Sequence, residues 1–424
     1  MIENISISRF KSIKDISLDL GRVNMFIGGN GAGKSNILEA IGIASASIYR
    51  GLGDTDLSAK GIRLTPAELM KSAFKQDRLA QTFEICVSFL NSVKYKCNLN
   101  SKENDALIRF HSESCFIGNE KQFGRSGNGS TVHGRSIFGD LDKDRGMWDQ
   151  IRTAHEFPKI LIDQFDEFSK YKIFTPQTDV LRGVRSGYLD ASPFGLHGEG
   201  LGNALSGVFS LRQNYRSGSN KNEAAFNYIE DSLKLSFLPG WNNTVRVGKI
   251  DSKLVSRGIQ DKASEMVYFV DKFMKINRNT LSLYDSSEGT LFLLFIAILL
   301  SHKDSPRYFA LDNVDNALNP VMTRRLLESL IAQIDKVYEH NLTFGPRQMF
   351  LTSHNPTSLD AFDIFDDQQR VFVVRRAEDG ATVAKRLAPP PGMSKDEWRI
   401  ASKGRNLSQL WLDGLIEGVN GRGI

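Results

Sequence analysis

The sequence predicts an α/β fold in which a mixed N-terminal sheet is combined with a parallel-sheet core and a helical insertion. A short apolar strand, Val23–Ile27, runs into a glycine-rich loop and then into a helical pattern that starts at Ser35. Apolar residues alternate in 3–20 and again in 82–98, which is typical of paired strands. From Val267 onward the chain returns to strand, turn and helix order, as a parallel lobe requires.

The composition is that of a folded protein, because 41% of the 424 residues are hydrophobic and 24% are charged. We expect a discontinuous core formed by 1–198 and 266–387, a helical insertion at 199–265, and a C-terminal tail, 388–424, packed on the core. Glycine, serine and lysine dominate 118–146, which predicts a long loop there. The net charge of +5 permits contact with nucleic acid but does not require it.

The cysteine content and the hydropathy pattern both predict a cytoplasmic protein without membrane contact. Cys86, Cys97 and Cys115 show no metal-ligand spacing and are too few for a disulfide framework, so we expect reduced thiols. The N-terminal residues form neither the basic nor the apolar part of a secretion signal. The longest apolar run, Leu291–Leu300, is about half of what a bilayer span needs and predicts a buried helix.

One segment matches the phosphate-binding pattern G-x-x-x-x-G-K-[ST] in full. It reads Gly28-Gly29-Asn30-Gly31-Ala32-Gly33-Lys34-Ser35 and lies between an apolar strand and a helix. Glycines let backbone N–H groups wrap around a phosphate, and the helix N-terminus adds its positive dipole end. We predict that Lys34 reaches the β and γ phosphates and that Ser35 is a ligand of Mg²⁺. ATP and Mg²⁺ are therefore the predicted cofactors.

The C-terminal half supplies the second part of such a site. An apolar strand ends in Asp312, which is the Walker B pattern of a carboxylate that holds Mg²⁺. The small-residue turn at Ser287 and Gly289 opens the apolar helix and predicts an anion site at its N-terminus. A further apolar strand ends in Thr352-Ser353-His354.

The order of these motifs resembles that of an ABC-type ATPase head. The opening segment Ile7–Ile13, together with Gly33–Ala40, is similar to the RecF, SMC and OLD branch of that family. Segments Leu181–Gly183, Gly198–Leu201 and Leu407–Leu412 resemble the stand-alone RecF/OLD-like ATPases of bacterial defence islands.

The resemblance implies a homodimer or a higher homo-oligomer with two copies facing head to tail. Each ATP would lie between one P-loop, including Asn36 after it, and Ser287 and Gly289 of the partner subunit. His354 would contact the γ-phosphate, or it caps the turn that follows. Gln177 would sense Mg²⁺ and the attacking water, or it is an ordinary polar loop residue.

One position departs from the family pattern, in which a glutamate follows the Walker B aspartate. Asn313 stands there, and an amide cannot accept a proton as a general base. Either Asp315 supplies the carboxylate, or hydrolysis is slow and ATP holds the dimer together, or a partner protein completes the site. We favour slow hydrolysis.

Only 37 residues follow Leu387, too few for the nuclease domain of OLD-type proteins. We therefore expect a separate effector, a nuclease or a toxin, and interpret the chain as a nucleotide-gated sensor and scaffold in anti-phage defence. The alternative is a RecF-like DNA-binding ATPase of repair or recombination. Basic clusters near Arg375, Lys385 and Arg399 permit DNA contact, and solvated surfaces explain them equally well.

Overall fold

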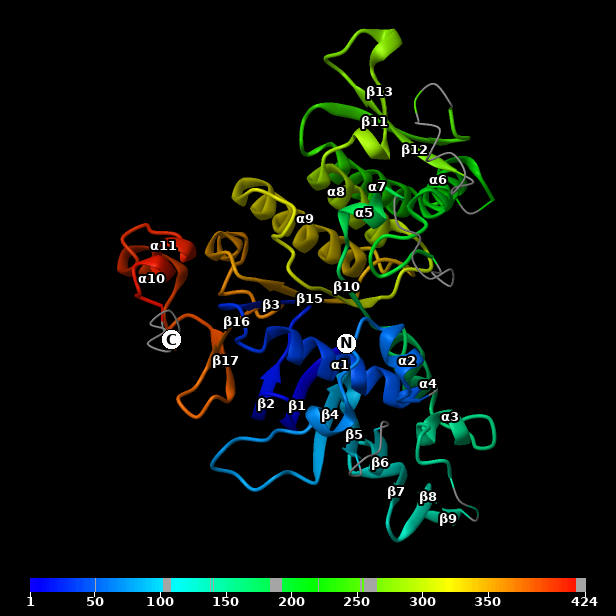
Figure 1. The fold of residues 1–424 in the computed structure, drawn as a ribbon, viewed down its shortest axis with the longest axis vertical. Coiled ribbons are helices and arrows are strands. Elements are labelled where there is room, and N and C mark those ends of the chain that lie inside the picture. Colours follow the sequence, from blue (N-terminus) through cyan, green and yellow to red (C-terminus); the bar gives the residue numbers. More distant parts are fainter. Residues whose placement is uncertain are drawn as a thin grey trace. The chain divides into compact units, whose positions relative to one another are not determined.

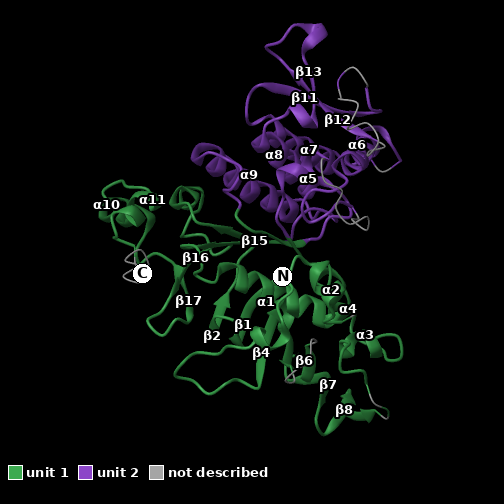
Figure 2. Cartoon of the chain, in the orientation of Figure 1, with its two compact units in different colours: residues 1–173, 308–313, 348–424 green, residues 174–307, 314–347 purple. Residues whose placement is uncertain are grey.

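The fold is described from a computed structural model. It describes residues 1–416 apart from 50, 102–107, 138, 140, 184–192, 220, 252–253 and 255–264. The chain divides into two compact units, which are shown in different colours in Figure 2. Unit 1 comprises residues 1–173, 308–313 and 348–424, and unit 2 comprises residues 174–307 and 314–347.

Unit 1 contains an antiparallel sheet of eight strands in the order β2-β1-β4-β5-β6-β7-β8-β9. Alternating apolar residues on β1 and β2 point into the core, as the sequence predicts. The strands are β1 (Ile2–Phe10), β2 (Ile13–Asp19), β4 (Thr82–Phe89), β5 (Val93–Asn100), β6 (Arg109–Ile117), β7 (Glu120–Ser126), β8 (Gly129–Val132) and β9 (Arg135–Ile137).

The second sheet is the parallel core that the sequence predicts, in the order β10-β14-β15-β3-β16-β17. Strands β14, β15, β3 and β16 are parallel, and β17 closes one edge antiparallel to β16. The strands are β3 (Val23–Ile27), β10 (Lys172–Phe174), β14 (Tyr308–Leu311), β15 (Gln348–Ser353), β16 (Gln369–Arg376) and β17 (Thr382–Leu387). Every residue of β3, β14 and β15 is buried, which explains why most of their residues are apolar.

Helix α1 (Lys34–Ile48) connects the two sheets of unit 1 (Figure 1). Its residues share one hydrophobic core with side chains of both sheets, and for this reason almost every position of the helix is apolar or small. The other helices of the unit are α2 (Asp54–Ser58), η1 (Ala67–Met70), η2 (Leu90–Ser92), α3 (Met147–Ile151), α4 (Lys159–Phe168), η7 (Pro356–Ala361), α10 (Lys395–Ala401) and α11 (Leu407–Leu412).

Unit 2 combines a helical bundle with a small antiparallel sheet in the order β11-β12-β13. The apolar run becomes the buried helix α8, which packs against α6 and α7. Within the described residues, no helix is both long and apolar enough to cross a membrane. The elements are α5 (Thr178–Leu181), α6 (Leu201–Ser217), α7 (Glu223–Leu233), η3 (Lys234–Phe237), β11 (Asn242–Gly248), β12 (Met266–Asp271), η5 (Ile276–Arg278), β13 (Thr280–Ser282), η6 (Leu283–Asp285), α8 (Glu288–Ser301) and α9 (Pro320–Glu339).

The prediction of a long loop over 118–146 is wrong, because strands β7, β8 and β9 lie within it. Glycines in this stretch serve the hairpin turns instead, and Gly118, Gly129 and Gly134 have positive φ angles. The strands are short and carry many polar residues, so their alternation is hard to recognise in the sequence. The domain boundaries predicted above stay a prediction.

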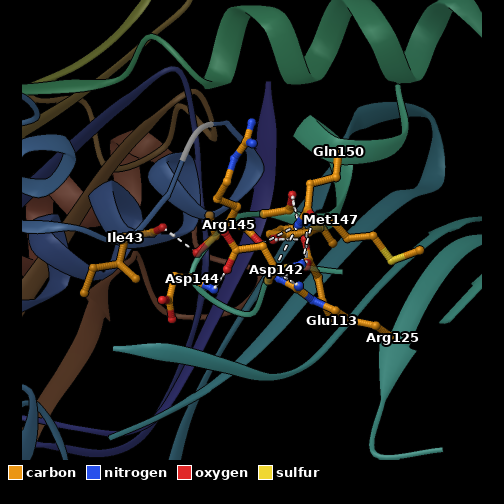
Figure 3. A network of polar contacts seen from close by, with 11 residues as sticks. Ile43, Glu113, Arg125, Asp142, Asp144, Arg145, Met147 and Gln150 are labelled. Carbon is orange, nitrogen blue, oxygen red and sulfur yellow. Dashed lines mark hydrogen bonds and ion pairs between the residues drawn. The ribbon is translucent and has the colours of Figure 1, made fainter. Parts of the chain in front are cut away.

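A buried ion pair fixes one end of the antiparallel sheet. The carboxylate of Glu113 on β6 accepts hydrogen bonds from the Tyr95 hydroxyl at 2.7 Å and from the Met147 backbone N–H at 3.0 Å. The Arg125 guanidinium lies 3.0 Å from the same carboxylate (Figure 3). Burial raises the pKa of Glu113, although these three donors favour the charged form.

Arg125 ties the segment before α3 to the sheet. Its guanidinium donates to the backbone carbonyls of Asp142 and Arg145 (Figure 3). It also stacks over the Phe110 ring at 4.2 Å. Both terminal nitrogens of the guanidinium are therefore partnered, while its buried Nε has no hydrogen-bond partner. This network holds residues 141–146, which lie outside the helices and strands.

We expect Arg125→Met to destabilise unit 1 by about 3 kcal/mol, because it leaves the Glu113 carboxylate buried without its cation. Thermal unfolding should show a midpoint lowered by roughly 5 °C. The control is Lys96→Met, which removes the partly exposed pair with Glu84 on the same sheet and should cost less than about 1 kcal/mol. Equal effects of the two variants would contradict the proposed importance of the buried pair.

Candidate functional site

The phosphate-binding loop of unit 1 is packed on one side and open on the other. A Cβ atom at Gly28 would lie 2.0 Å from the Val374 carbonyl oxygen, and one at Gly33 would lie 2.1 Å from the Thr382 hydroxyl. Gly33 also has a φ of 105°, which L-residues rarely adopt. Gly29 and Gly31 have no atom within 4 Å of such a position, so this side of the loop has room for a phosphate group.

The outer side of the loop is held by residues from distant parts of unit 1. The Thr382 hydroxyl donates to the Ala32 carbonyl at 2.9 Å and lies 2.7 Å from the Ser12 hydroxyl. The Arg376 guanidinium donates to the Gly31 carbonyl at 2.9 Å, and burial lowers its pKa. The Asn36 side chain donates to Ser12 at 2.7 Å. The β1–β2 turn and the β16–β17 hairpin together fix the loop.

Lys34 lies against the loop that it is predicted to serve. Its ammonium group donates to the carbonyl oxygens of Gly28 at 2.7 Å and Gly29 at 3.0 Å, and only 6% of the residue is exposed. No side chain caps the N-terminus of α1, so none competes with an anion at this end of the helix. Asn30 lies exposed between the two open glycines.

Asp312 joins three neighbouring parallel strands at their carboxyl ends. Ser35, which follows the β3 loop, donates its hydroxyl to Oδ2 at 2.9 Å. Thr352 of β15 donates to Oδ1 at 2.5 Å, and its oxygen accepts the Asn313 backbone N–H at 2.8 Å. The structure therefore brings Lys34, Ser35, Asp312 and Asn313 into one site.

Asn313 is exposed and has a φ of 57°. This left-handed conformation is one that asparagine tolerates better than most residues. The chain thus turns sharply directly after the Walker B strand, and the bond from its N–H to Thr352 fixes the turn.

A charged cluster lies beside the loop on α1. The Glu39 carboxylate is 2% exposed and pairs with Lys11 at 2.5 Å and with Arg63 at 2.5 Å. Burial lowers the pKa of Lys11 against the opposing effect of Glu39. The hydrogen bond to Glu39 raises the pKa of Arg63, and the charge of Asp312 adds to this effect. Arg63 also donates to the Asn36 side chain at 3.1 Å.

His354 follows β15 and is exposed. The turn after it is capped by its neighbour, because the Asn355 side chain accepts the Thr357 backbone N–H at 3.1 Å. His354 is therefore not the cap of η7. The adjacent Ser353 carbonyl accepts the Gly28 backbone N–H at 3.4 Å, which places the end of β15 beside the phosphate-binding loop.

The other predicted site residues belong to unit 2. Ser287 is the N-cap of α8, and its hydroxyl accepts the Thr290 backbone N–H at 3.3 Å. A Cβ atom at Gly289 would lie 3.0 Å from the Ala317 carbonyl, so a larger residue would crowd the turn. Gln177 is exposed at the start of α5 and Asp315 is 7% exposed.

The residues of unit 1 suit a magnesium nucleotide. Ser35 and Asp312 offer two oxygen atoms side by side. Mg²⁺ usually has about this many protein ligands when phosphates and waters supply the others. Among the residues that the structure describes, there is no group of three or more His, Cys, Asp or Glu that could hold a metal alone.

Comparisons with known proteins agree with this geometry. A sequence model described as "AAA ATPase domain" matches residues 1–130, and one described as "AAA domain, putative AbiEii toxin, Type IV TA system" matches residues 153–360. A crystal structure of an SMC head bound to the C-terminal winged-helix domain of ScpA is 15% identical, with a TM-score of 0.53 over 91% of this chain and 97% of that one. Models of AAA-type ATPase domains thus match two parts of the chain, and its fold is that of an SMC ATPase head.

Further solved structures are more distant from this ATPase. The SMC head from Pyrococcus furiosus with an extended coiled coil, bound to the C-terminal domain of ScpA, is 13% identical with a TM-score of 0.49, covering 95% of this chain and 98% of that one. The recombination mediator RecF is 14% identical with a TM-score of 0.34, covering 92% and 98%. None of the curated proteins matches the ATPase in sequence.

Sequence analysis missed Thr352, Glu39 and Arg63 as parts of the site. Thr352 follows the apolar residues Met349–Leu351, and its signal is a hydroxyl group at the end of an apolar run. Glu39 lies within the segment Gly33–Ala40, and its signal is an acid on an apolar helix, which predicts a buried partner. Arg63 lies in a segment without any motif, so only the tertiary structure reveals it.

We expect Thr352→Val to weaken Mg²⁺-dependent ATP binding by roughly tenfold, because it removes the hydroxyl that orients Asp312 and holds Asn313. Binding measured in EDTA should change little, and Thr352→Ser should restore the wild-type affinity. Titration with a fluorescent ATP analogue, with and without Mg²⁺, checks this. An equal loss in EDTA, or no rescue by serine, would assign Thr352 to packing alone.

Proposed function

We propose that two copies of the chain close around ATP and Mg²⁺ and that the closed assembly is a nucleotide-gated sensor and scaffold for a separate effector in anti-phage defence. The observation that carries the proposal is Asn313 at the position of the catalytic glutamate, next to a site that is otherwise equipped for a magnesium nucleotide. Such a site would bind ATP and hydrolyse it slowly, which suits a clamp rather than a motor.

In this proposal, the loop residues hold the nucleotide. Backbone N–H groups at the open face around Gly29 and Gly31 receive the phosphates, and Lys34 exchanges its bonds to the loop carbonyls for the β and γ phosphates. Ser35 and Asp312 hold Mg²⁺. When bound, Mg²⁺ neutralises part of the phosphate charge.

The remaining site residues complete the proposal across the dimer. Ser287 and Gly289 of the partner subunit would present the N-terminus of α8 to the γ-phosphate, as the family resemblance implies. His354 would contact the same phosphate from the end of β15, and Gln177 would orient the metal and the water. Asn313 can orient a water molecule by hydrogen bonding but cannot take its proton.

Slow hydrolysis is favoured over a base supplied by Asp315. This carboxylate is 7% exposed, so little of it is open to a water molecule. Completion of the site by a partner protein stays an alternative.

The proposed role in defence is supported by the descriptions of two similar proteins or domains. One matching sequence model is described with a toxin–antitoxin system, and the similar SMC head is bound to a domain of another protein. Both descriptions favour a chain that works with a protein partner. A reducing cytoplasmic location is part of the proposal, because all three cysteines are buried thiols. A RecF-like ATPase of DNA repair or recombination has the same fold and predicts strong stimulation of turnover by DNA.

We expect ATP to convert the wild-type protein to a dimer or larger assembly while turnover stays slow with and without duplex DNA. Lys34→Ala should bind ATP at least roughly tenfold more weakly and should not assemble, because the charged contacts to the phosphates are lost. Light scattering coupled to phosphate release measures both quantities. Fast turnover that DNA stimulates strongly would favour the repair-type function instead.

We expect Asn313→Glu to raise ATP turnover at least roughly tenfold by supplying a general base. The left-handed turn at this position costs glutamate about 1 kcal/mol, so thermal stability should fall slightly. Asn313→Gln is the matched control, because it has the same length without a carboxylate. If Asp315→Ala abolishes the wild-type turnover, Asp315 is the base and the slow-clamp account is wrong.

A further inference from the structure

The tip of the β12–β13 hairpin in unit 2 exposes large apolar side chains. Phe273, Met274 and Ile276 are 75%, 59% and 87% exposed. They lie within four consecutive positions of one turn. Single exposed apolar residues are ordinary, but a cluster of three marks a surface that another molecule covers.

The same tip is basic. Lys272, Lys275 and Arg278 alternate with the apolar residues, and 272–278 contains no acidic residue. All seven residues are exposed. The Lys272 ammonium group lies 5.0 Å from the centre of the Phe273 ring. The surface therefore suits a partner that offers negative charge and an apolar face together.

Hydrogen bonds within the hairpin hold the tip in shape. The Asp271 backbone N–H donates to the Asn279 carbonyl at 2.7 Å, and the Asp271 carboxylate accepts the Phe273 N–H at 2.8 Å. The Arg278 N–H donates to the Lys275 carbonyl at 2.7 Å. The apolar side chains are thus presented on a structured turn, which lowers the ordering cost of binding.

The composition of the tip selects among three kinds of partner. Lysine is depleted in protein–protein interfaces, and the tip contains two. Tryptophan and tyrosine, which anchor proteins at membrane surfaces, are missing from 272–278. Duplex DNA is met in the minor groove by apolar wedges such as Phe, Met and Ile beside Lys, Arg and Asn, and the exposed Asn277 completes that set.

More cations continue along the neighbouring strand. Arg246 on β11 and Lys249 after it are both exposed. Arg246 is four residues from Asn242, whose register partner is Asp271 at the base of the tip. At about 3.3 Å per residue this places Arg246 roughly 13 Å along the strand, which is the rise of about four base pairs of duplex.

Hydrogen bonds lead from the base of the tip to the turn at the start of α8. The Lys272 backbone N–H donates to the Trp241 carbonyl at 3.0 Å. The Trp241 indole N–H donates to the Thr290 hydroxyl at 3.1 Å, and that hydroxyl lies 2.8 Å from the Ser287 hydroxyl. The base of the tip and Ser287 are therefore connected through the side chains of Trp241 and Thr290.

We propose that the β12–β13 tip binds duplex DNA and that Trp241 links its occupancy to the Ser287 turn, so that DNA acts on ATP-driven assembly. The DNA contact stands on the tip alone. The effect on assembly rests on the proposed function, in which Ser287 contacts the nucleotide of a second copy. Tip occupancy would then change the ATP concentration needed for assembly.

The first test measures the binding of duplex DNA in the absence of nucleotide. The readout is the fluorescence anisotropy of a labelled 30-base-pair duplex at several salt concentrations. We expect Lys272→Glu/Lys275→Glu to bind at least tenfold more weakly, with a log–log salt slope shallower by about two. Phe273→Ala/Ile276→Ala should bind roughly tenfold more weakly with the slope unchanged. The matched control, Lys94→Glu/Lys303→Glu, changes the net charge equally at two exposed lysines.

The second test is light scattering of Trp241→Phe, which keeps a ring against Phe269 but removes the donor to Thr290. This variant should bind duplex normally, while duplex no longer shifts the ATP concentration needed for assembly. Lys34→Ala should also bind duplex normally, so failure of ATP-driven assembly is distinguishable from failure of the tip.

Three outcomes would overturn the inference. The tip variants and the control could bind duplex equally, which would place DNA elsewhere. The tip could bind vesicles of phosphatidylserine and phosphatidylcholine but not duplex, which would make it a membrane contact. Trp241→Phe could respond to duplex as the wild type does, which would remove the link to Ser287.

Discussion

The arrangement of the site depends on the parallel pairing of β14, β15 and β3. Because parallel strands end at the same edge, their carboxyl ends carry Asp312, Thr352 and the loop before Ser35 to one place. The hydroxyl groups of Ser35 and Thr352 then share the two oxygens of the Asp312 carboxylate. A slip of one residue in either pairing would turn these side chains away from each other, so the fully buried strands fix the register and the chemistry together.

The parts of this ATPase that the sequence predicts well are those where local chemistry and tertiary structure agree. Four of the five residues at Val23–Ile27 are apolar, which is typical of a buried strand, and the glycines after them are typical of a tight loop. The hairpins in 118–146 were missed because short strands with glycine and serine carry little periodicity. Arg63 was missed for a different reason: its neighbours Glu39 and Asn36 come from a helix some 24 residues earlier, and no local pattern encodes that meeting.

Asn313 shows how sequence and structure constrain the same position differently. In the sequence it is a missing carboxylate, which limits proton transfer. In the structure it is also a left-handed residue, held by the bond from its N–H to Thr352. The backbone conformation favours asparagine independently of any catalytic role. The backbone conformation and a slowly hydrolysing site therefore both favour asparagine at position 313. Its presence does not require that the site has lost its function.

Unit 2 gives the Ser287 turn more than one support. The Trp241 indole donates to the Thr290 hydroxyl, which in turn lies beside the Ser287 hydroxyl. On the other side, the Ser286 carbonyl accepts a hydrogen bond from Arg182 at 3.2 Å. Arg182 directly follows α5, whose N-cap is Gln177, so the segment proposed to sense the metal and the turn proposed to contact phosphate are linked within one unit. A turn supported from both sides has few positions available to it.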